Sequence, residues 1–101
     1  DIDRLIAIRK KVPIPLVLHG GSDTPEDKIL SSIDHGIAKI NINSDLKAAF
    51  TRSLRNSLSN VPDDIAFEKH LAQATTAMKS TLKQKMQLFR SIGKAPGLLA
   101  N

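Results

Sequence analysis

Two segments of this chain have the apolar pattern of short strands, and four have the pattern of helices. The run 16–18 is apolar at every position and the run 37–42 alternates, as strands of a sheet do. Elsewhere, apolar residues recur every three or four positions. The predicted helices are 3–12, 24–36, a third from Asn43 or Ser44 to about 58, and 65–91. The order of strand, helix and strand predicts an α/β fold with a right-handed crossover between parallel strands.

Local signals set the bounds of these elements. Pro13 and Pro15 end the first helix, and Gly36 ends the second. Thr24 before Pro25 predicts an N-cap followed by a proline at the first helical position. Gly93 to Gly97 end the final helix, and the last four residues, 98–101, are expected to form a loose tail. One apolar stripe is predicted on that helix, formed by Phe67, Leu71, Ala74, Met78, Leu82, Met86 and Phe89.

Two strands alone do not make a stable sheet. The chain has 101 residues, of which 41% are apolar, but it starts without a methionine and shows only two strands. Parallel strands need covered faces and neighbours on both sides. We therefore expect a piece of a larger α/β protein, poorly folded by itself. The expected organisation is two strand–loop–helix units over 1–60, then a loop and the C-terminal helix over 61–97.

The charge balance favours an anionic small molecule over nucleic acid. Fifteen basic and ten acidic residues give a net charge of +5, but there are only three aromatic residues, all phenylalanine. A solvated helix face explains the lysines of the last helix better than a nucleic-acid surface does. Cysteine is absent, and no apolar run approaches the length of about 20 residues that spans a membrane. We expect a cytoplasmic protein without a nucleic-acid or membrane partner.

His19 is the candidate metal ligand. It comes directly after the first strand and shares a face with Val17. A neutral imidazole at the C-terminal end of a barrel strand can ligate zinc or exchange protons. The alternative is a structural histidine that bonds a neighbouring carbonyl, and the Gly-Gly-Ser that follows favours the ligand. His35 and His70 are expected to be surface or capping residues.

Small and amide-bearing residues follow both strands and suit an anion. Backbone N–H groups at helix N-termini bind phosphate, and glycine permits close approach. The alternatives are an ordinary tight turn for the first group and simple helix capping for the second. The candidate phosphate and substrate ligands are Gly20, Gly21 and Ser22 after the first strand, and Asn41, Asn43 and Ser44 around the end of the second.

These two motifs resemble a known family. The segments 15–22 (PLVLHGGS) and 38–46 (AKININSDL, with Asn41, Asn43 and Ser44) look like the end of the class II, zinc-dependent fructose-bisphosphate and tagatose-bisphosphate aldolases. The segment 77–95 is similar to the C-terminal helix of that family. The resemblance spans nearly the whole chain but only about the last third of such an enzyme.

The resemblance implies strands seven and eight of a TIM (β/α)8 barrel, followed by a long C-terminal helix. It makes His19 one of three zinc-ligating histidines. Gly20, Gly21 and Ser22, with Asn43 and Ser44, would then hold a substrate phosphate. Asn41 would contact the dihydroxyacetone-phosphate portion of a phosphorylated ketose. Family members are commonly dimers or tetramers and can bind a monovalent cation near the phosphate.

Two departures and one alternative qualify what this resemblance implies. Asp23 replaces a glycine that is common after the serine, and Asn43 stands where fructose-bisphosphate enzymes usually carry aspartate, so tagatose-bisphosphate is also a candidate substrate. The family's other zinc histidines and its catalytic acids lie upstream, so this segment holds no catalytic residue and is expected to be inactive alone. The alternative is a non-catalytic remnant, or an interaction fragment that binds phosphate weakly.

Overall fold

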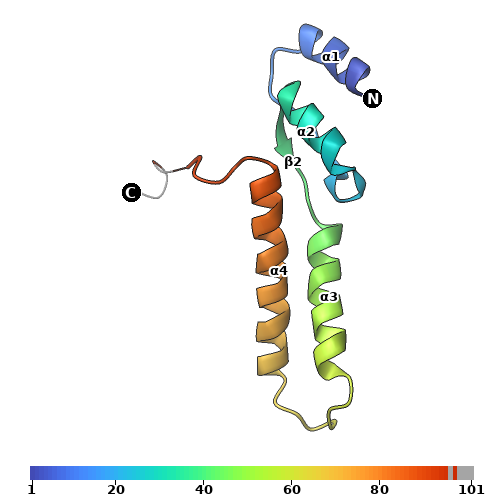
Figure 1. Cartoon of the computed structure of the whole chain (residues 1–101), viewed down its shortest axis with the longest axis vertical. Helices are drawn as coiled ribbons and strands as arrows, with labels where there is room; N and C mark the ends of the chain where they lie inside the picture. The colour runs from blue at the N-terminus through green and yellow to red at the C-terminus, as the bar shows by residue number, and fades with distance from the viewer. Residues whose placement is uncertain (96, 98–101) are drawn as a thin grey trace. The chain divides into compact units, whose positions relative to one another are not determined.

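The computed structural model describes residues 1–95 and 97 and contains short strands and longer helices. It divides into two compact units, Asp1–Ile42 with Met86–Asn101, and Asn43–Lys85, each of which is described by itself. The elements are α1 (Ile2–Lys11), β1 (Leu16–Leu18), the 3-10 helix η1 (Gly21–Asp23), α2 (Glu26–Asp34), β2 (Ile37–Ile40), α3 (Ser44–Leu58) and α4 (Glu68–Leu88). Figure 1 labels the four α-helices and β2.

The two strands pair in parallel, as the crossover pattern predicted. Leu16 is opposite Ile37, but Val17 is opposite Lys39, so the register shifts by one residue after Leu16. The strand β2 ends at Ile40, which is earlier than the predicted end at residue 42. The backbone pairing nevertheless continues one step further, because the N–H of Asn41 donates to the carbonyl of Leu18 at 3.0 Å.

The helix α2 contacts both α1 and β2 in the first unit. Its Ile29 is fully buried, and the hydroxyl of the buried Ser32 donates to the carbonyl of Ile29 at 2.7 Å. This bond satisfies a hydroxyl that would otherwise be costly to bury. The other face of the sheet is not covered in this way. On it, Val17 is 44% exposed, and its partner on β2, Lys39, is also exposed.

Thr24 does not cap α2, which corrects the sequence prediction. The helix begins at Glu26 with Pro25 at the N-cap position and no side-chain capping bond. The hydroxyl of Thr24 instead donates back to the carbonyl of Gly20 at 3.2 Å. The loop after β1 therefore uses this hydroxyl to close itself. The helix ends at Asp34, and Gly36, which was predicted to end it, follows the C-cap residue with a left-handed φ of +104°.

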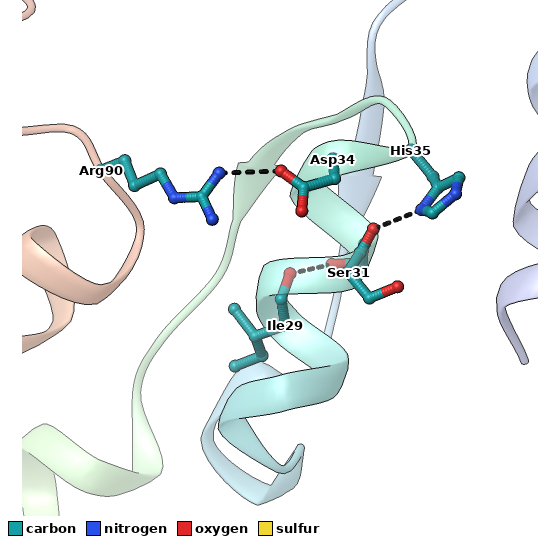
Figure 2. A network of polar contacts seen from close by, with 6 residues as sticks. Ile29, Ser31, Asp34, His35 and Arg90 are labelled. Atoms are coloured by element: carbon teal, nitrogen blue, oxygen red, sulfur yellow. Dashed lines mark hydrogen bonds and ion pairs between the residues drawn. The ribbon is translucent and has the colours of Figure 1, made fainter.

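The C-terminal end of α2 carries a small polar network (Figure 2). Arg90 reaches Asp34 with 2.8 Å between Nη1 and Oδ1, and both side chains are more than half exposed. On the helix itself, Nδ1 of His35 lies 2.7 Å from the carbonyl oxygen of Ser31. An exposed ion pair of this kind contributes little to stability. His35 is the helix C-cap residue, which confirms the capping role expected for it.

The second unit is a helical hairpin of α3 and the part of α4 up to Lys85. Lys85 and Asp45 form a half-buried ion pair at 2.7 Å, which joins the end of this part of α4 to the first turn of α3. The helix α4 is three residues shorter at each end than predicted. Its buried apolar side chain is the small Ala74, whereas Phe67 and Leu82 are 59% and 43% exposed. Phe67 and Leu82 of the predicted stripe are therefore largely exposed in this unit, and the single stripe itself stays a prediction.

No helix within residues 1–95 and 97 has the length and apolar character that crossing a membrane requires. The tail expected at residues 98–101 lies outside the described residues.

Because so little apolar surface is buried, we expect the 101-residue chain alone to unfold without a sharp transition. Among the described residues only Ile29 and Ala74 are fully buried apolar side chains. Two parallel strands with free edges add little stability. Circular dichroism on heating should show a broad loss of helix, with binding of a hydrophobic dye before heating. A single steep transition of a monomer would contradict this expectation.

Candidate functional site

The site is built at the C-terminal ends of β1 and β2. His19 follows Leu18 directly, and Asn41 follows Ile40 directly. Since the two strands run in parallel with Leu18 opposite Ile40, the next residue of each strand comes out on the same side of the sheet. Nδ2 of Asn41 lies 3.2 Å from Nδ1 of His19. The structure thus brings together the imidazole and the amide for which the sequence predicted separate roles.

The two glycines after His19 meet different physical constraints. Gly20 has φ of +70° and ψ of +31°, a left-handed conformation that L residues disfavour, but a Cβ there would meet nothing within 4 Å. Gly21 is buried, and a Cβ there would lie 2.6 Å from Cγ2 of Ile40 and 3.3 Å from the carbonyl oxygen of Asn41. Gly20 therefore turns the chain, and Gly21 lets the loop pack on the end of β2.

Ser22 lies within η1 and is half-buried, next to the exposed Asp23. The remaining expected ligands, Asn43 and Ser44, belong to the second unit. Asn43 is at the N-cap position of α3 without a side-chain capping bond, and both residues are exposed. The alternative that Asn43 only caps the helix is therefore not supported by a hydrogen bond from its side chain. The expected meeting of this helix start with the glycine loop stays a prediction.

The described residues offer one imidazole rather than a complete metal site. No group of three or more His, Cys, Asp or Glu side chains among them is arranged to hold a metal ion. His19 is exposed, and its contact with Asn41 uses Nδ1, so it is suited to be a single ligand. A catalytic zinc site takes three protein ligands. These residues therefore fit zinc as a contributor of one ligand.

His70 differs from its expected surface or capping role. The residue is half-buried near the start of α4, and its Nδ1 is shielded from solvent without a hydrogen-bond partner in the described part of the chain. No sequence signal marked this position, because the burial of one ring atom depends on how α4 packs. The direct contact between His19 and Asn41 was also missed, since it follows from the strand register.

The structure is similar to that of known aldolases. It matches the crystal structure of the YdjI aldolase from Escherichia coli K12 with a TM-score of 0.83 and 33% sequence identity, covering 94% of this chain and 35% of that one. The parallel strands with their helices therefore place the chain in an α/β class that includes aldolases. The family model of the class-II fructose-bisphosphate aldolases matches residues 1–94, and the chain belongs to this family. The resemblance seen in the sequence is confirmed.

Three curated relatives carry different substrate names. A sulfofructosephosphate aldolase of Alkalicoccus urumqiensis is 38% identical over 92% of this chain and 32% of its own length. A fructose-bisphosphate aldolase of Thermus caldophilus is 37% identical over 94% and 38%. A 6-phospho-5-dehydro-2-deoxy-D-gluconate aldolase of Bacillus licheniformis is 41% identical over 87% and 30%. The chain spans about a third of the length of the curated relatives it matches.

The tight packing at Gly21 predicts a strong effect of a single methyl group. Gly21→Ala in the natural protein should lower the free energy of unfolding by about 1–3 kcal/mol, because the new Cβ meets the stiff, β-branched Ile40. The change in urea midpoint measures this effect. Gly20→Asn is the matched control, since asparagine tolerates the left-handed conformation and the space there is open. Equal stability of Gly21→Ala and the unchanged protein would contradict the packing described.

Proposed function

We propose that this chain forms strands seven and eight, with their helices and a long C-terminal helix, of the (β/α)8 barrel of a zinc-dependent ketose-bisphosphate aldolase. The reaction is cleavage of fructose- or tagatose-1,6-bisphosphate between C3 and C4, which yields dihydroxyacetone phosphate and glyceraldehyde 3-phosphate. Membership of the class-II family supports an aldolase activity. The parallel pairing of β1 and β2 and the overall likeness to a solved aldolase support the barrel.

One observation carries this proposal: His19 and Asn41 touch at the C-terminal ends of neighbouring parallel strands. Active sites of barrel enzymes are built at this end of the strands. An imidazole that can ligate a metal and an amide that can donate or accept a hydrogen bond therefore lie close enough to contact one small molecule. Both side chains remain accessible at this edge, since His19 is exposed and Asn41 only half-buried.

Zinc is the metal that this proposal requires. His19 would hold it together with ligands outside the described set, because no complete site occurs within that set. When bound, zinc supplies a Lewis acid that polarises a substrate oxygen. The other residues proposed for this site bind the substrate and not the metal. We assign to the amide of Asn41 the binding of an oxygen of the dihydroxyacetone-phosphate portion, and we assign no residue of this segment as a catalytic acid.

The glycine loop is proposed to bind the phosphate, and Asn43 and Ser44 are proposed as phosphate ligands from the second unit. Gly20 leaves open space beside its backbone, and Ser22 adds a hydroxyl to the same loop. Asn43 and Ser44 begin a helix of 15 residues, whose N-terminal N–H groups and dipole favour an anion. Asn43 is neutral, so this position does not repel a phosphate. The net charge of +5 favours approach of an anionic substrate.

The names of the relatives narrow the substrate to a phosphate ester and no further. Each of the three names includes a phosphate group, but the sugar portions differ. All three relatives are similarly distant from this chain, with 37–41% sequence identity. We infer a phosphorylated ketose and assign neither fructose nor tagatose. A dimer or tetramer, and a monovalent cation beside the phosphate, complete the proposal by analogy with the family.

Replacing the proposed zinc ligand tests this function. In the natural protein, His19→Ala should abolish zinc-dependent cleavage and reduce bound zinc, because a three-ligand site loses one ligand. A coupled assay of triose-phosphate release and metal analysis of the purified variant measure both effects. His35→Ala is the matched control, since that ring only bonds a carbonyl on its own helix. Full turnover by His19→Ala would refute the assignment.

A further inference from the structure

We propose that Lys39 forms an ion pair inside the barrel with a carboxylate from another barrel strand, below the candidate site at the strand ends. This inference rests on the proposed function only for the barrel itself. It adds a partner for a charged side chain to which the proposed function gives no role. The observations behind it are the face of the sheet on which Lys39 lies, its exposure in this chain and its charge.

The strand register places Lys39 on the same face of the sheet as His19. Val17 on β1 is opposite Lys39 on β2. Side chains two residues apart along a strand share a face, so His19 lies on the face of Val17 and Asn41 on the face of Lys39. Lys39 therefore lies two residues before the strand-end contact, which is about 7 Å along the strand.

This face corresponds to the interior of a barrel. The helix α2 contacts β2, whereas the side chains of Val17 and Lys39 are exposed in this chain. In a (β/α)8 barrel, helices cover the outside of the sheet, and side chains of the opposite face fill the interior in layers dominated by bulky branched residues. Val17 is typical of such a layer. Lys39 instead brings a positive charge into it.

A lysine in a packed interior needs a negative partner. An unpaired charge is far more costly to bury than a paired one. The ion pairs among the described residues join Lys85 to Asp45 and Arg90 to Asp34, and neither involves Lys39. The chain spans about a third of the length of its curated relatives. We therefore assign the partner to one of the barrel strands outside the described residues.

A carboxylate suits this position better than the phosphate of a substrate does. The barrel has to be stable before substrate binds, and a group two residues below the strand ends is enclosed by packed side chains. A carboxylate of the protein neutralises Lys39 in both states, whereas a substrate does so only while it is bound. Neighbouring strands lie about 4.8 Å apart, and the flexible four-carbon stem of lysine spans such a distance.

Urea unfolding of the natural protein tests this inference. Lys39→Met keeps a long, unbranched side chain but leaves the carboxylate unpaired, so we expect a clearly lower urea midpoint. Lys39→Arg retains a positive charge and should lose less. Lys28→Met, on the exposed surface of α2, is the matched control and should keep the midpoint of the unchanged protein. A crystal structure of the unchanged protein should show Nζ of Lys39 within about 4 Å of a carboxylate oxygen from another strand.

The pH dependence separates a lost ion pair from lost packing. An unpaired buried carboxylate becomes neutral by taking up a proton, whereas the paired carboxylate of the unchanged protein loses its partner interaction when it is protonated. The difference in midpoint between Lys39→Met and the unchanged protein should therefore narrow from neutral to mildly acidic pH. A difference that does not vary with pH would contradict the ion pair.

The outcomes also separate this inference from the function on which it rests. An Nζ of Lys39 that contacts only water or substrate, or an unchanged midpoint in Lys39→Met, overturns the ion pair and leaves the aldolase proposal intact. A crystal structure in which β1 and β2 belong to no closed barrel overturns both. If Lys39→Met does not fold, the crystal structure of the unchanged protein decides, and a carboxylate on Lys39 supports the inference.

Discussion

Parallel pairing between β1 and β2 is the constraint on which the rest of this structure depends. The ladder sets Leu18 opposite Ile40, and the bond from the N–H of Asn41 to the carbonyl of Leu18 carries the pairing to the strand ends. In another register, the imidazole of His19 and the amide of Asn41 would not lie next to each other. A shift by one residue would turn either side chain to the opposite face of the sheet. The candidate chemistry is therefore a consequence of backbone hydrogen bonds.

The loop after β1 shows how the backbone and the side chains share this constraint. Gly20 supplies the left-handed turn, Gly21 removes the Cβ that would strike Ile40, and the hydroxyl of Thr24 closes the loop on the carbonyl of Gly20. The loop is thereby bound to the end of β2 rather than free. The functional proposal and the packing use the same residues. Glycine at position 21 has a structural reason whether or not phosphate binds there.

Local signals in the sequence were enough to predict most elements but not their contacts. The apolar run at Leu16–Leu18 and the glycine at 36 located a strand and a helix end correctly. Thr24 misled because a hydroxyl can bond either the helix that follows or the loop that precedes it. Periodicity places the stripe residues of α4 on one face of the helix, but it does not show which of them are covered. Phe67 and Leu82 are exposed although they belong to that stripe.

The same contrast holds for the candidate site: its residues could be predicted from the sequence, but their contacts could not. Single residues at strand ends, such as His19 and Asn41, could be named from the sequence because strand ends are where barrel enzymes bind ligands. Their contact could not be named, because it depends on a register shift after Leu16 that no residue pattern reveals. The sequence also did not predict that Nδ1 of His70 is buried, since the burial of one ring atom follows from packing alone. The joint action of Asn43 and Ser44 with the glycine loop remains a prediction.

The most direct test of the central claim is a crystal structure of the natural protein soaked with zinc and inorganic phosphate, with zinc located by its anomalous signal. The account predicts a zinc peak about 2.0–2.1 Å from a nitrogen of His19, which is the usual zinc–imidazole distance. It also predicts phosphate against the backbone of Gly20–Ser22. A His19 ring that points away from Asn41 and from the zinc, with phosphate elsewhere, would contradict it.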